Sequence, residues 1–501
     1  MRKAFLALVL IALVALAISP VAAQGNVLVM ARAADTTGLD PHTQTAFASF
    51  RLLELIYEPL VNLDADLNVI PALAESWDFA EDGMTLSFAL RQGVTFHNGA
   101  DFTSADVAAT FARILDEATG AAARANYLNI ASIDTPDDYT VVFNLSAPDV
   151  PLLAALATTN AAIVDSADIE SGAVATVANG TGPFVLDNWT PEETTTLSAN
   201  ETWWGDGPNV DGIEIRIIPD EASILAALRA GTIDFALLND PLVATLLIGD
   251  ANVQLNRVPA IAYHVLQLRA AVEPLDKLEV RQAISCAIDR QEVLDTASLG
   301  EGIVTGPLTM AAFALPTDEL FCYEKDLDKA RELMTAAGVD GFTLKVIAAN
   351  AEPPTALSEA QSIQAQLAEI GITVEIESLE LSVYVDRWLA GDFEAAVALN
   401  GGRPDPYTMY SRYWQTSGNL NNVAGYIDET LDDLMARGRT ETDPEARYEI
   451  FAEFQRHLTE MAPWVWLYTG YEYTAQLPVV QGFVPYPTDS LISLAQVTLS
   501  R

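Results

Sequence analysis

The chain has 501 residues, with 26 lysines and arginines against 69 aspartates and glutamates, and a formal charge of −43. Such an acidic composition argues against nucleic acid and anionic lipid surfaces as partners, because binding to them requires a basic stripe on the protein. Half of the residues are hydrophobic, which provides a large core and excludes wholesale disorder. At roughly 150 residues per domain, the length predicts about three domains or sub-domains.

The first 23 residues have the pattern of a secretory signal peptide. A basic start at Met1–Lys3 precedes an apolar run from Ala4 to Ile18, and Val21-Ala22-Ala23 supplies small residues for cleavage. Gln24 is then the first mature residue. We therefore expect an exported protein, in the periplasm or on the extracellular face of the cytoplasmic membrane.

The next part of the chain predicts a small α/β unit. A helix is expected over 48–60, followed by strands over 84–90 and 139–145 in which apolar and polar residues alternate. Between the strands, Thr103 and Asp106 form a capping-box pair at the start of another helix. His97-Asn98-Gly99 is more typical of a hairpin turn than of a ligand contact.

From about residue 270 onward, helices and strands alternate. Gly180-Thr181-Gly182-Pro183 marks a crossing between sub-domains. Later elements are a strand over 213–217, helices over 221–230, 326–337 and 358–370, a strand over 372–376, and a helix capped by Asp443. This alternation predicts a parallel-sheet α/β architecture.

No motif for catalysis, cofactor binding or metal binding is found. The four histidines lack metal-ligand spacing, and a nucleophile elbow, a phosphate loop and a dinucleotide fingerprint are all missing. Carboxylate pairs arise by chance among 69 acidic residues, so an exported hydrolase remains the alternative of a different class. Cys286 and Cys322 either form a disulfide, which export permits, or remain two buried thiols.

One irregular segment is a candidate binding loop. Gly401-Gly402-Arg403-Pro404-Asp405-Pro406 brings a guanidinium and a carboxylate together, and Trp414 follows shortly after. Glycine-rich loops on a rigid scaffold often carry binding residues. The alternative is a solvated connector.

The order of several short motifs resembles the extracellular solute-binding proteins of family 5, the oligopeptide, dipeptide and nickel binding proteins of ATP-driven (ABC) importers. The resemblance runs from about residue 26 to the C-terminus. The motifs that carry it are Ala74-Glu75-Ser76-Trp77, Leu90–Gly99, Ser104-Ala105-Asp106-Val107, Gly180–Phe184, Trp204-Gly205, Gly231-Thr232-Ile233-Asp234, Val280–Ile284 and Ala287–Arg290.

This resemblance implies a two-lobed periplasmic-binding-protein-like fold (type II, cluster C) that closes around its ligand and delivers it to a membrane permease. Lobe I would comprise residues 25–62, 180–265 and 480–501, with an extra sub-domain over 63–179, and lobe II residues 266–479. The protein would act as a monomer, without a cofactor and without catalysis.

The ligand that the resemblance implies is a peptide, but one anchor of peptide-binding relatives is missing. Those relatives carry an aspartate that pairs with the peptide ammonium, and Gly402 stands at its position here. Either Asp405 substitutes, or the cleft holds no free amino terminus. Arg403 offers a partner for a ligand carboxylate instead.

The opposite wall is expected in the loop after Asp40-Pro41, which contributes neutral polar groups and an aromatic ring. The expected ligand-binding residues are Gln44, Thr45, Phe47, Gly402, Arg403, Asp405 and Trp414. Stacking and hydrogen bonding would also suit an oligosaccharide, which is the runner-up ligand. A sensory relay, in which the closed form docks on a receptor, is a further alternative.

Overall fold

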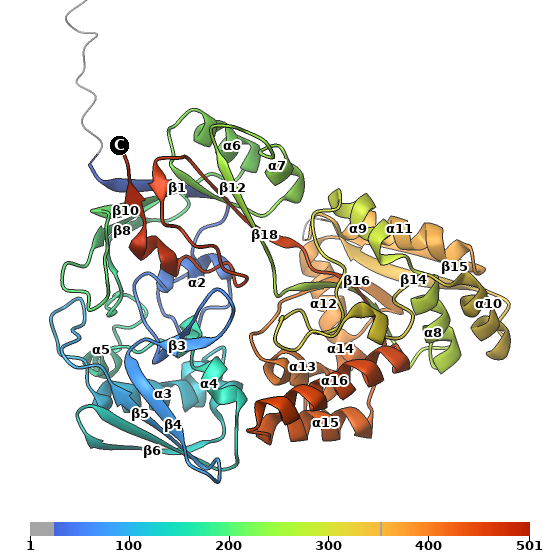
Figure 1. The fold of residues 1–501 in the computed structure, drawn as a ribbon, viewed down its shortest axis with the longest axis horizontal. Coiled ribbons are helices and arrows are strands. Elements are labelled where there is room, and N and C mark those ends of the chain that lie inside the picture. Colours follow the sequence, from blue (N-terminus) through green and yellow to red (C-terminus); the bar gives the residue numbers. More distant parts are fainter. Residues whose placement is uncertain (1–24, 351–352) are drawn as a thin grey trace, which may run out of the picture.

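The computed structural model describes residues 25–350 and 353–501 and shows two lobes of mixed α/β structure side by side (Figure 1). The predicted signal peptide, residues 1–23, lies outside the described residues. The expected two-lobed α/β architecture is confirmed by the fold.

The first lobe is built on a seven-stranded sheet in the order β12-β18-β11-β1-β10-β9-β8. The central strand β1 (Val27–Arg32) is parallel to β10 (Gly212–Ile217) and β11 (Phe235–Leu238). The other strands are antiparallel to their neighbours: β8 (Phe184–Thr190), β9 (Thr194–Ala199), β12 (Gln254–Pro259) and β18 (Tyr471–Gln476).

Both faces of this sheet are covered. Leu28 and Met30 of β1 join a core that includes α2 (Phe47–Leu53), whereas Val29 and Ala31 join a core formed with α6 (Glu221–Arg229) and α7 (Pro241–Thr245). A short pair, β19 (Val480–Gln481) and β20 (Thr498–Leu499), closes the C-terminal segment on the α2 side. A continuous apolar run such as β1 is typical of a strand covered on both faces.

A four-stranded antiparallel sheet forms the extra unit below the first lobe (Figure 1). Its order is β4-β5-β7-β6, and Phe111 of the helix α3 packs against Phe143 of β7 with 5.1 Å between ring centroids. The Thr103–Asp106 capping box is present at the start of α3, as predicted. The elements are β2 (Val61–Leu63), β3 (Val69–Pro71), β4 (Ala74–Phe79), β5 (Thr85–Leu90), α3 (Ser104–Leu115), β6 (Ile130–Asp137), β7 (Thr140–Leu145), α4 (Pro151–Ala155) and α5 (Ser166–Ser171).

The second lobe has a five-stranded sheet in the order β15-β14-β16-β13-β17. Helices α8 to α11 share a core with one face, and α12 to α16 with the other. The elements are β13 (Tyr263–Leu268), α8 (Leu278–Ala287), α9 (Arg290–Ser298), α10 (Leu327–Ala336), β14 (Phe342–Ala349), α11 (Ala356–Ala368), β15 (Ile372–Leu379), α12 (Leu381–Ala390), β16 (Ala395–Asn400), α13 (Pro406–Trp414), α14 (Asn421–Ala424), α15 (Glu429–Thr440), α16 (Pro444–Met461) and β17 (Trp464–Tyr468).

Both large sheets are mixed, so the prediction of parallel sheets is only partly right. In the second lobe, β14 is parallel to β15 and β16, but β13 is antiparallel to both of its neighbours. Four antiparallel strands adjoin the segments that connect the lobes: β12 and β18 in the first sheet, and β13 and β17 in the second. In each sheet, the strand before one crossing pairs with the strand after the other, so the two run in opposite directions. The structure also joins Cys286 and Cys322 in a disulfide.

The first predicted helix is shorter than expected. It spans Phe47–Leu53 rather than 48–60, since the next backbone groups serve other partners. Gly182 and Phe184 donate their N–H groups to the carbonyls of Ile56 and Leu55, at 2.9 and 3.0 Å. A Cβ at Gly180 would collide with the carbonyl of Ile56, so this glycine-rich segment is a close backbone crossing.

Candidate ligand-binding site

Two short segments connect the lobes. The chain enters the second lobe through residues 260–262, between β12 and β13, and returns through residues 469–470, between β17 and β18. The segments are hydrogen bonded to each other: Ala260 donates its N–H to the carbonyl of Gly470 at 2.9 Å, and the Thr469 hydroxyl bonds the carbonyl of Ala260 at 2.7 Å. The return to the first sheet therefore begins at β18, before the residue 480 expected from sequence.

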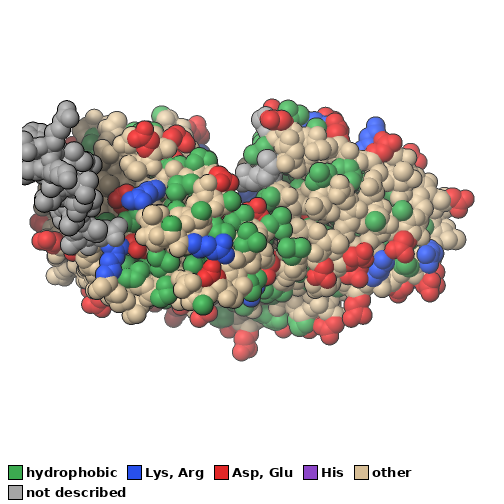
Figure 2. All heavy atoms as spheres, turned by 90° about the horizontal axis from the view of Figure 1, so that it is seen from above, with side chains coloured by type: hydrophobic (Ala, Val, Ile, Leu, Met, Phe, Trp, Pro, Cys, Tyr) green, Lys and Arg blue, Asp and Glu red, His purple; other side chains and the backbone are tan. Residues whose placement is uncertain are grey.

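A recess opens between the two lobes in the space-filling view (Figure 2). Away from the crossing segments, the lobes touch again where α15 meets the loop before α4. Arg439 Nη2 lies 2.8 Å from Asp149 Oδ2, and the N–H of Val150 donates to the carbonyl of Arg439 at 3.0 Å. The recess is therefore bounded at one end by the crossing segments and at the other by the contact between α15 and the loop before α4.

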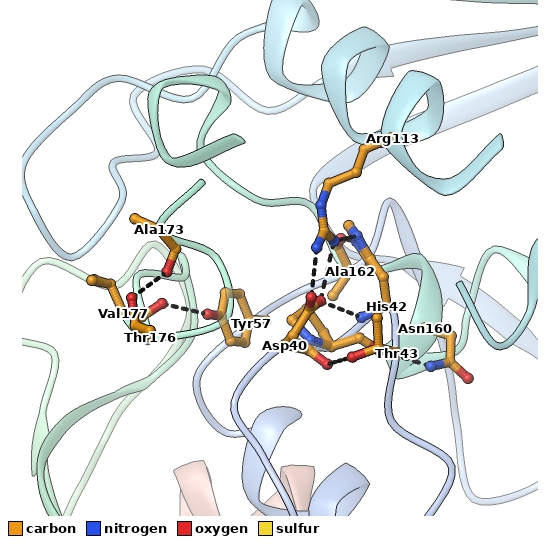
Figure 3. A network of polar contacts seen from close by, with 11 residues as sticks. Asp40, His42, Thr43, Tyr57, Arg113, Asn160, Ala162, Ala173, Thr176 and Val177 are labelled. Atoms are coloured by element: carbon orange, nitrogen blue, oxygen red, sulfur yellow. Dashed lines mark hydrogen bonds and ion pairs between the residues drawn. The ribbon is translucent and has the colours of Figure 1, made fainter. Parts of the chain in front are cut away.

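The first-lobe wall is the loop that follows Asp40, and it is fixed to the extra unit (Figure 3). Arg113 of α3 forms an ion pair with Asp40 and also donates to His42 Nδ1 at 2.6 Å. His42 Nε2 then donates to the carbonyl of Ala162 at 2.9 Å. Burial, together with the Arg113 guanidinium, lowers the pKa of His42 to about 4, so the imidazole is neutral. Asn160 donates to the carbonyl of Pro41 at 2.7 Å.

This rigid loop presents two of the three residues expected on this wall. Thr45 is exposed, and Phe47, at the start of α2, is 57% exposed. The Gln44 side chain is instead turned back on its own loop, where its carbonyl oxygen accepts from the Thr37 hydroxyl at 2.6 Å. An exposed phenylalanine beside an anchored loop is a suitable apolar contact for a ligand.

The second-lobe wall is the segment between β16 and α13. An ideal Cβ on Gly401 would lie 3.9 Å from Phe47 Cζ, so this segment faces the first-lobe wall directly. A Cβ on Gly402 would collide with the backbone carbonyl of Ile261 in the first crossing segment. No side chain fits at position 402 without moving this backbone, and an aspartate there is sterically excluded.

Two arginines converge on this glycine pair. Arg403 Nη1 donates to the carbonyl of Gly402 at 3.0 Å, and Arg412 Nη2 of α13 donates to the carbonyl of Gly401 at 3.1 Å. Arg403 is exposed to solvent, yet surrounding protein and the neighbouring Arg412 lower its pKa. This combination of solvent exposure and surrounding protein atoms is expected for a side chain on the wall of a recess.

Asp405 does not face the recess, which corrects its expected role as an anchor for a ligand ammonium. Its carboxylate is the N-cap of α13, accepting from the N–H of Tyr407 at 2.8 Å, and Arg447 Nη2 of α16 lies 2.7 Å from Oδ2. The side chain is 7% exposed. Burial raises the pKa of Asp405, and the Arg447 guanidinium opposes this shift.

Trp414 is also removed from the expected ligand contacts. It is 2% exposed, and its ring packs edge-on against Trp464 with 4.8 Å between centroids. The aromatic cluster belongs to the core under β17 and α13. The sequence showed an aromatic residue near a binding loop, but only the packing of α13 on the sheet shows which way the ring points.

One further contributor, Arg412, was not expected from sequence. Arg412 lies nine positions after Arg403, and only the direction of α13 brings the two together.

For Asp405 a local signal was available: Asp-Pro also starts α7 at Asp240 and α16 at Asp443, with the aspartate as N-cap in each case. The same dipeptide at Asp405-Pro406 indicates a helix cap.

The family follows from comparison with known proteins. The family model described as "Bacterial extracellular solute-binding proteins, family 5 Middle" matches residues 68–421. The chain belongs to this family. Proteins of this family bind solutes for transport and are not enzymes, which agrees with the interpretation of this chain as a binding protein.

Relatives of this family 5 protein cover nearly its whole length. The chain is 27% identical to the glutathione-binding protein of Escherichia coli K12, over 87% of this chain and 88% of that protein. It is 28% identical to the di/tripeptide-binding protein 3 of Pseudomonas aeruginosa, over 89% and 90%. The structure of DppA from Helicobacter pylori in complex with the peptide STSA aligns with a TM-score of 0.79 and 28% identity, covering 95% of this chain and 98% of that one.

Metal clusters and membrane-spanning helices were also sought in the part of the chain that the structure describes. Among residues 25–350 and 353–501, no group of three or more histidine, cysteine, aspartate or glutamate residues could hold a metal ion. Within the same ranges, every helix is too short or too polar to cross a membrane.

Proposed function

We propose that this protein is the exported, monomeric substrate-binding component of an ABC importer that captures a peptide-class solute between its lobes. The observation that carries this is the pairing of Phe47 with the Gly401–Arg403 segment across the recess, on a fold shared with peptide-binding relatives. Its relatives include proteins named for binding di- and tripeptides and glutathione. The partner that receives the solute is a membrane permease.

Closing of the lobes is the proposed means of capture. We assign lobe I to residues 25–62, 180–259 and 471–501, the extra sub-domain to 63–179, and lobe II to 263–468, because the seven-stranded and five-stranded sheets separate at residues 260–262 and 469–470. A solute that touches Phe47 and Arg403 together gains more contacts in the closed form than in the open form. Only such differential affinity shifts the balance between the two forms.

A thermal-shift panel on the mature protein tests this function. A ligand that binds only the folded state at 100 times its Kd stabilises it by about 2.7 kcal/mol, a shift of several degrees. We expect short peptides to raise the Tm and neutral oligosaccharides to leave it unchanged. The burial of Trp414 removes one of the two aromatic rings, Trp414 and Phe47, on which an oligosaccharide was expected to stack.

Three results would contradict the proposal. A shift with oligosaccharides alone would make this a sugar-binding member of the family. Turnover of a peptide, lost on replacing one or two carboxylates, would make it an exported hydrolase. Binding of the closed form to a receptor, without delivery to a permease, would make it a sensory component.

A further inference from the structure

Arg403 and Arg412 lie close enough for one charge to lower the pKa of the other, and in the part of the chain that the structure describes neither has a carboxylate within ion-pair distance. Arg269, Arg281 and Arg290 also have none there, but each is engaged by oxygens of other residues of its own lobe. Most other arginines have one: Arg113 pairs with Asp40, Arg439 with Asp149 and Arg447 with Asp405. In a protein with 69 acidic residues and a charge of −43, an unpaired pair of cations is unexpected.

The hydrogen bonds of these two arginines leave most of their donors unused. A guanidinium has five N–H donors. Each of the two donates to a single glycine carbonyl, Arg403 to Gly402 and Arg412 to Gly401, and Arg412 Nε is buried without a hydrogen-bond partner. The Arg412 guanidinium also lies 4.7 Å from the Tyr413 ring centroid. Repulsion from the Arg412 guanidinium is one of the causes that lower the pKa of Arg403, and an anion that contacts both groups would relieve this repulsion.

The alternative anchor, a carboxylate for a ligand ammonium, is absent from this wall. A side chain at position 402 is excluded by the carbonyl of Ile261, and Asp405 is buried against Arg447. The recess wall thus carries positive charge and no negative charge from the loop 401–405. The charge expected on the bound group is therefore negative.

We propose that Arg403 and Arg412 form the seat for a carboxylate of the ligand, so that the protein selects its solute by an acidic end and not by a free amino terminus. This inference rests on the proposed function and names its specificity. Planar guanidinium groups bind carboxylates through paired, charge-assisted hydrogen bonds. Within an acidic protein, a local cationic seat also attracts the anionic end and orients it.

The test uses titration calorimetry with variants of one peptide. The probes are trialanine, its N-acetylated form, its C-terminal amide, and an amidated tripeptide with a central glutamate. We expect trialanine and the N-acetylated form to bind alike, and the amide to bind about 10- to 100-fold more weakly, the range for loss of a charged hydrogen bond. Recovery of binding with the glutamate peptide would show that a side-chain carboxylate occupies the same seat.

Three variants connect this preference to the arginines. Arg403→Gln and Arg412→Gln should reduce the affinity for trialanine to that for its amide, and Arg403→Lys should restore part of the difference. Arg269→Gln is the control, because Arg269 bonds Asn422 at the far end of β13 and has no carboxylate partner among the described residues either. It should bind trialanine as the wild type does.

The possible outcomes distinguish a failure of the proposed carboxylate site from a failure of the proposed peptide-binding function. Equal binding of trialanine and its amide by the wild type would overturn the seat and leave the peptide function intact. Equal losses for acid and amide in Arg403→Gln would also overturn it, since the arginine would then act in lobe closure. If no peptide form binds the wild type while an oligosaccharide does, the proposed function fails and the carboxylate seat fails with it.

Discussion

Replacing Asp405 by asparagine should destabilise the ligand-free protein and spare ligand binding by the part that remains folded. Asparagine is as good an N-cap as aspartate, so the cap of α13 is retained. The ion pair to Arg447 is lost, and the Arg447 side chain is only 8% exposed. The variant therefore isolates the effect of leaving one buried cation without its partner.

The size of the effect follows from the burial of the pair. Removing one partner of a buried ion pair costs about 3–5 kcal/mol, because the other charge stays desolvated. Arg447 keeps the bond from Nε to the carbonyl of Gly438, at 2.8 Å, which favours the lower end of the range. A loss of about 3 kcal/mol lowers the Tm by roughly 6–12 °C for a folding unit of about 200 residues.

Calorimetry across pH provides the assay and its matched control. In Arg447→Met the unpaired group is Asp405, whose pKa burial already raises. A carboxyl with a raised folded-state pKa favours folding when protonated, so stability falls as pH rises through that pKa. Arg447→Met should therefore regain stability on acidification, while Asp405→Asn should not. An unchanged Tm for Asp405→Asn, with peptide binding abolished, would refute this assignment and place the carboxylate at the ligand.

Three other predictions concern the pH dependence, the disulfide and the contact between lobes. Burial raises the pKa of Glu54 from 4.5 to about 7, so the folded state retains this proton and stability falls as pH rises through that interval. Glu54→Gln should reduce this fall, measured by denaturant unfolding at about pH 5 and about pH 8. Reduction of Cys286–Cys322, separated by 36 positions, should lower the free energy of unfolding by about 4 kcal/mol. Arg439→Met breaks the ion pair to Asp149 and should increase the radius of gyration in small-angle scattering.

Each of these predictions has a clear contrary result. A Glu54→Gln variant with the wild-type pH profile would mean that this carboxyl is ionised at low pH in the folded state. A denaturation curve unaffected by reductant would show that the disulfide adds no stability. An Arg439→Met variant with unchanged scattering would show that this ion pair is not needed to keep the lobes in contact, since the hydrogen bond from Val150 to the carbonyl at position 439 remains.

The sequence determined those features whose cause lies within a few residues. The capping box of Thr103 and Asp106 starts α3, and Asp443 with Pro444 starts α16, because the partners of each cap are adjacent in the chain. His97-Asn98-Gly99 forms the predicted turn, with Gly99 at a positive φ of 87°. The family motifs likewise allowed the two-lobed fold to be expected.

Tertiary structure decided which side chains reach the recess between the lobes. Asp405 and Trp414 stand in the expected segment, yet α13 turns the first toward Arg447 and the second toward Trp464. Arg412 and Phe47 reach the recess only because a helix direction and the facing of two lobes place them there. Local signals fix where an element begins, whereas the direction of a side chain depends on what packs against the element from distant parts of the chain.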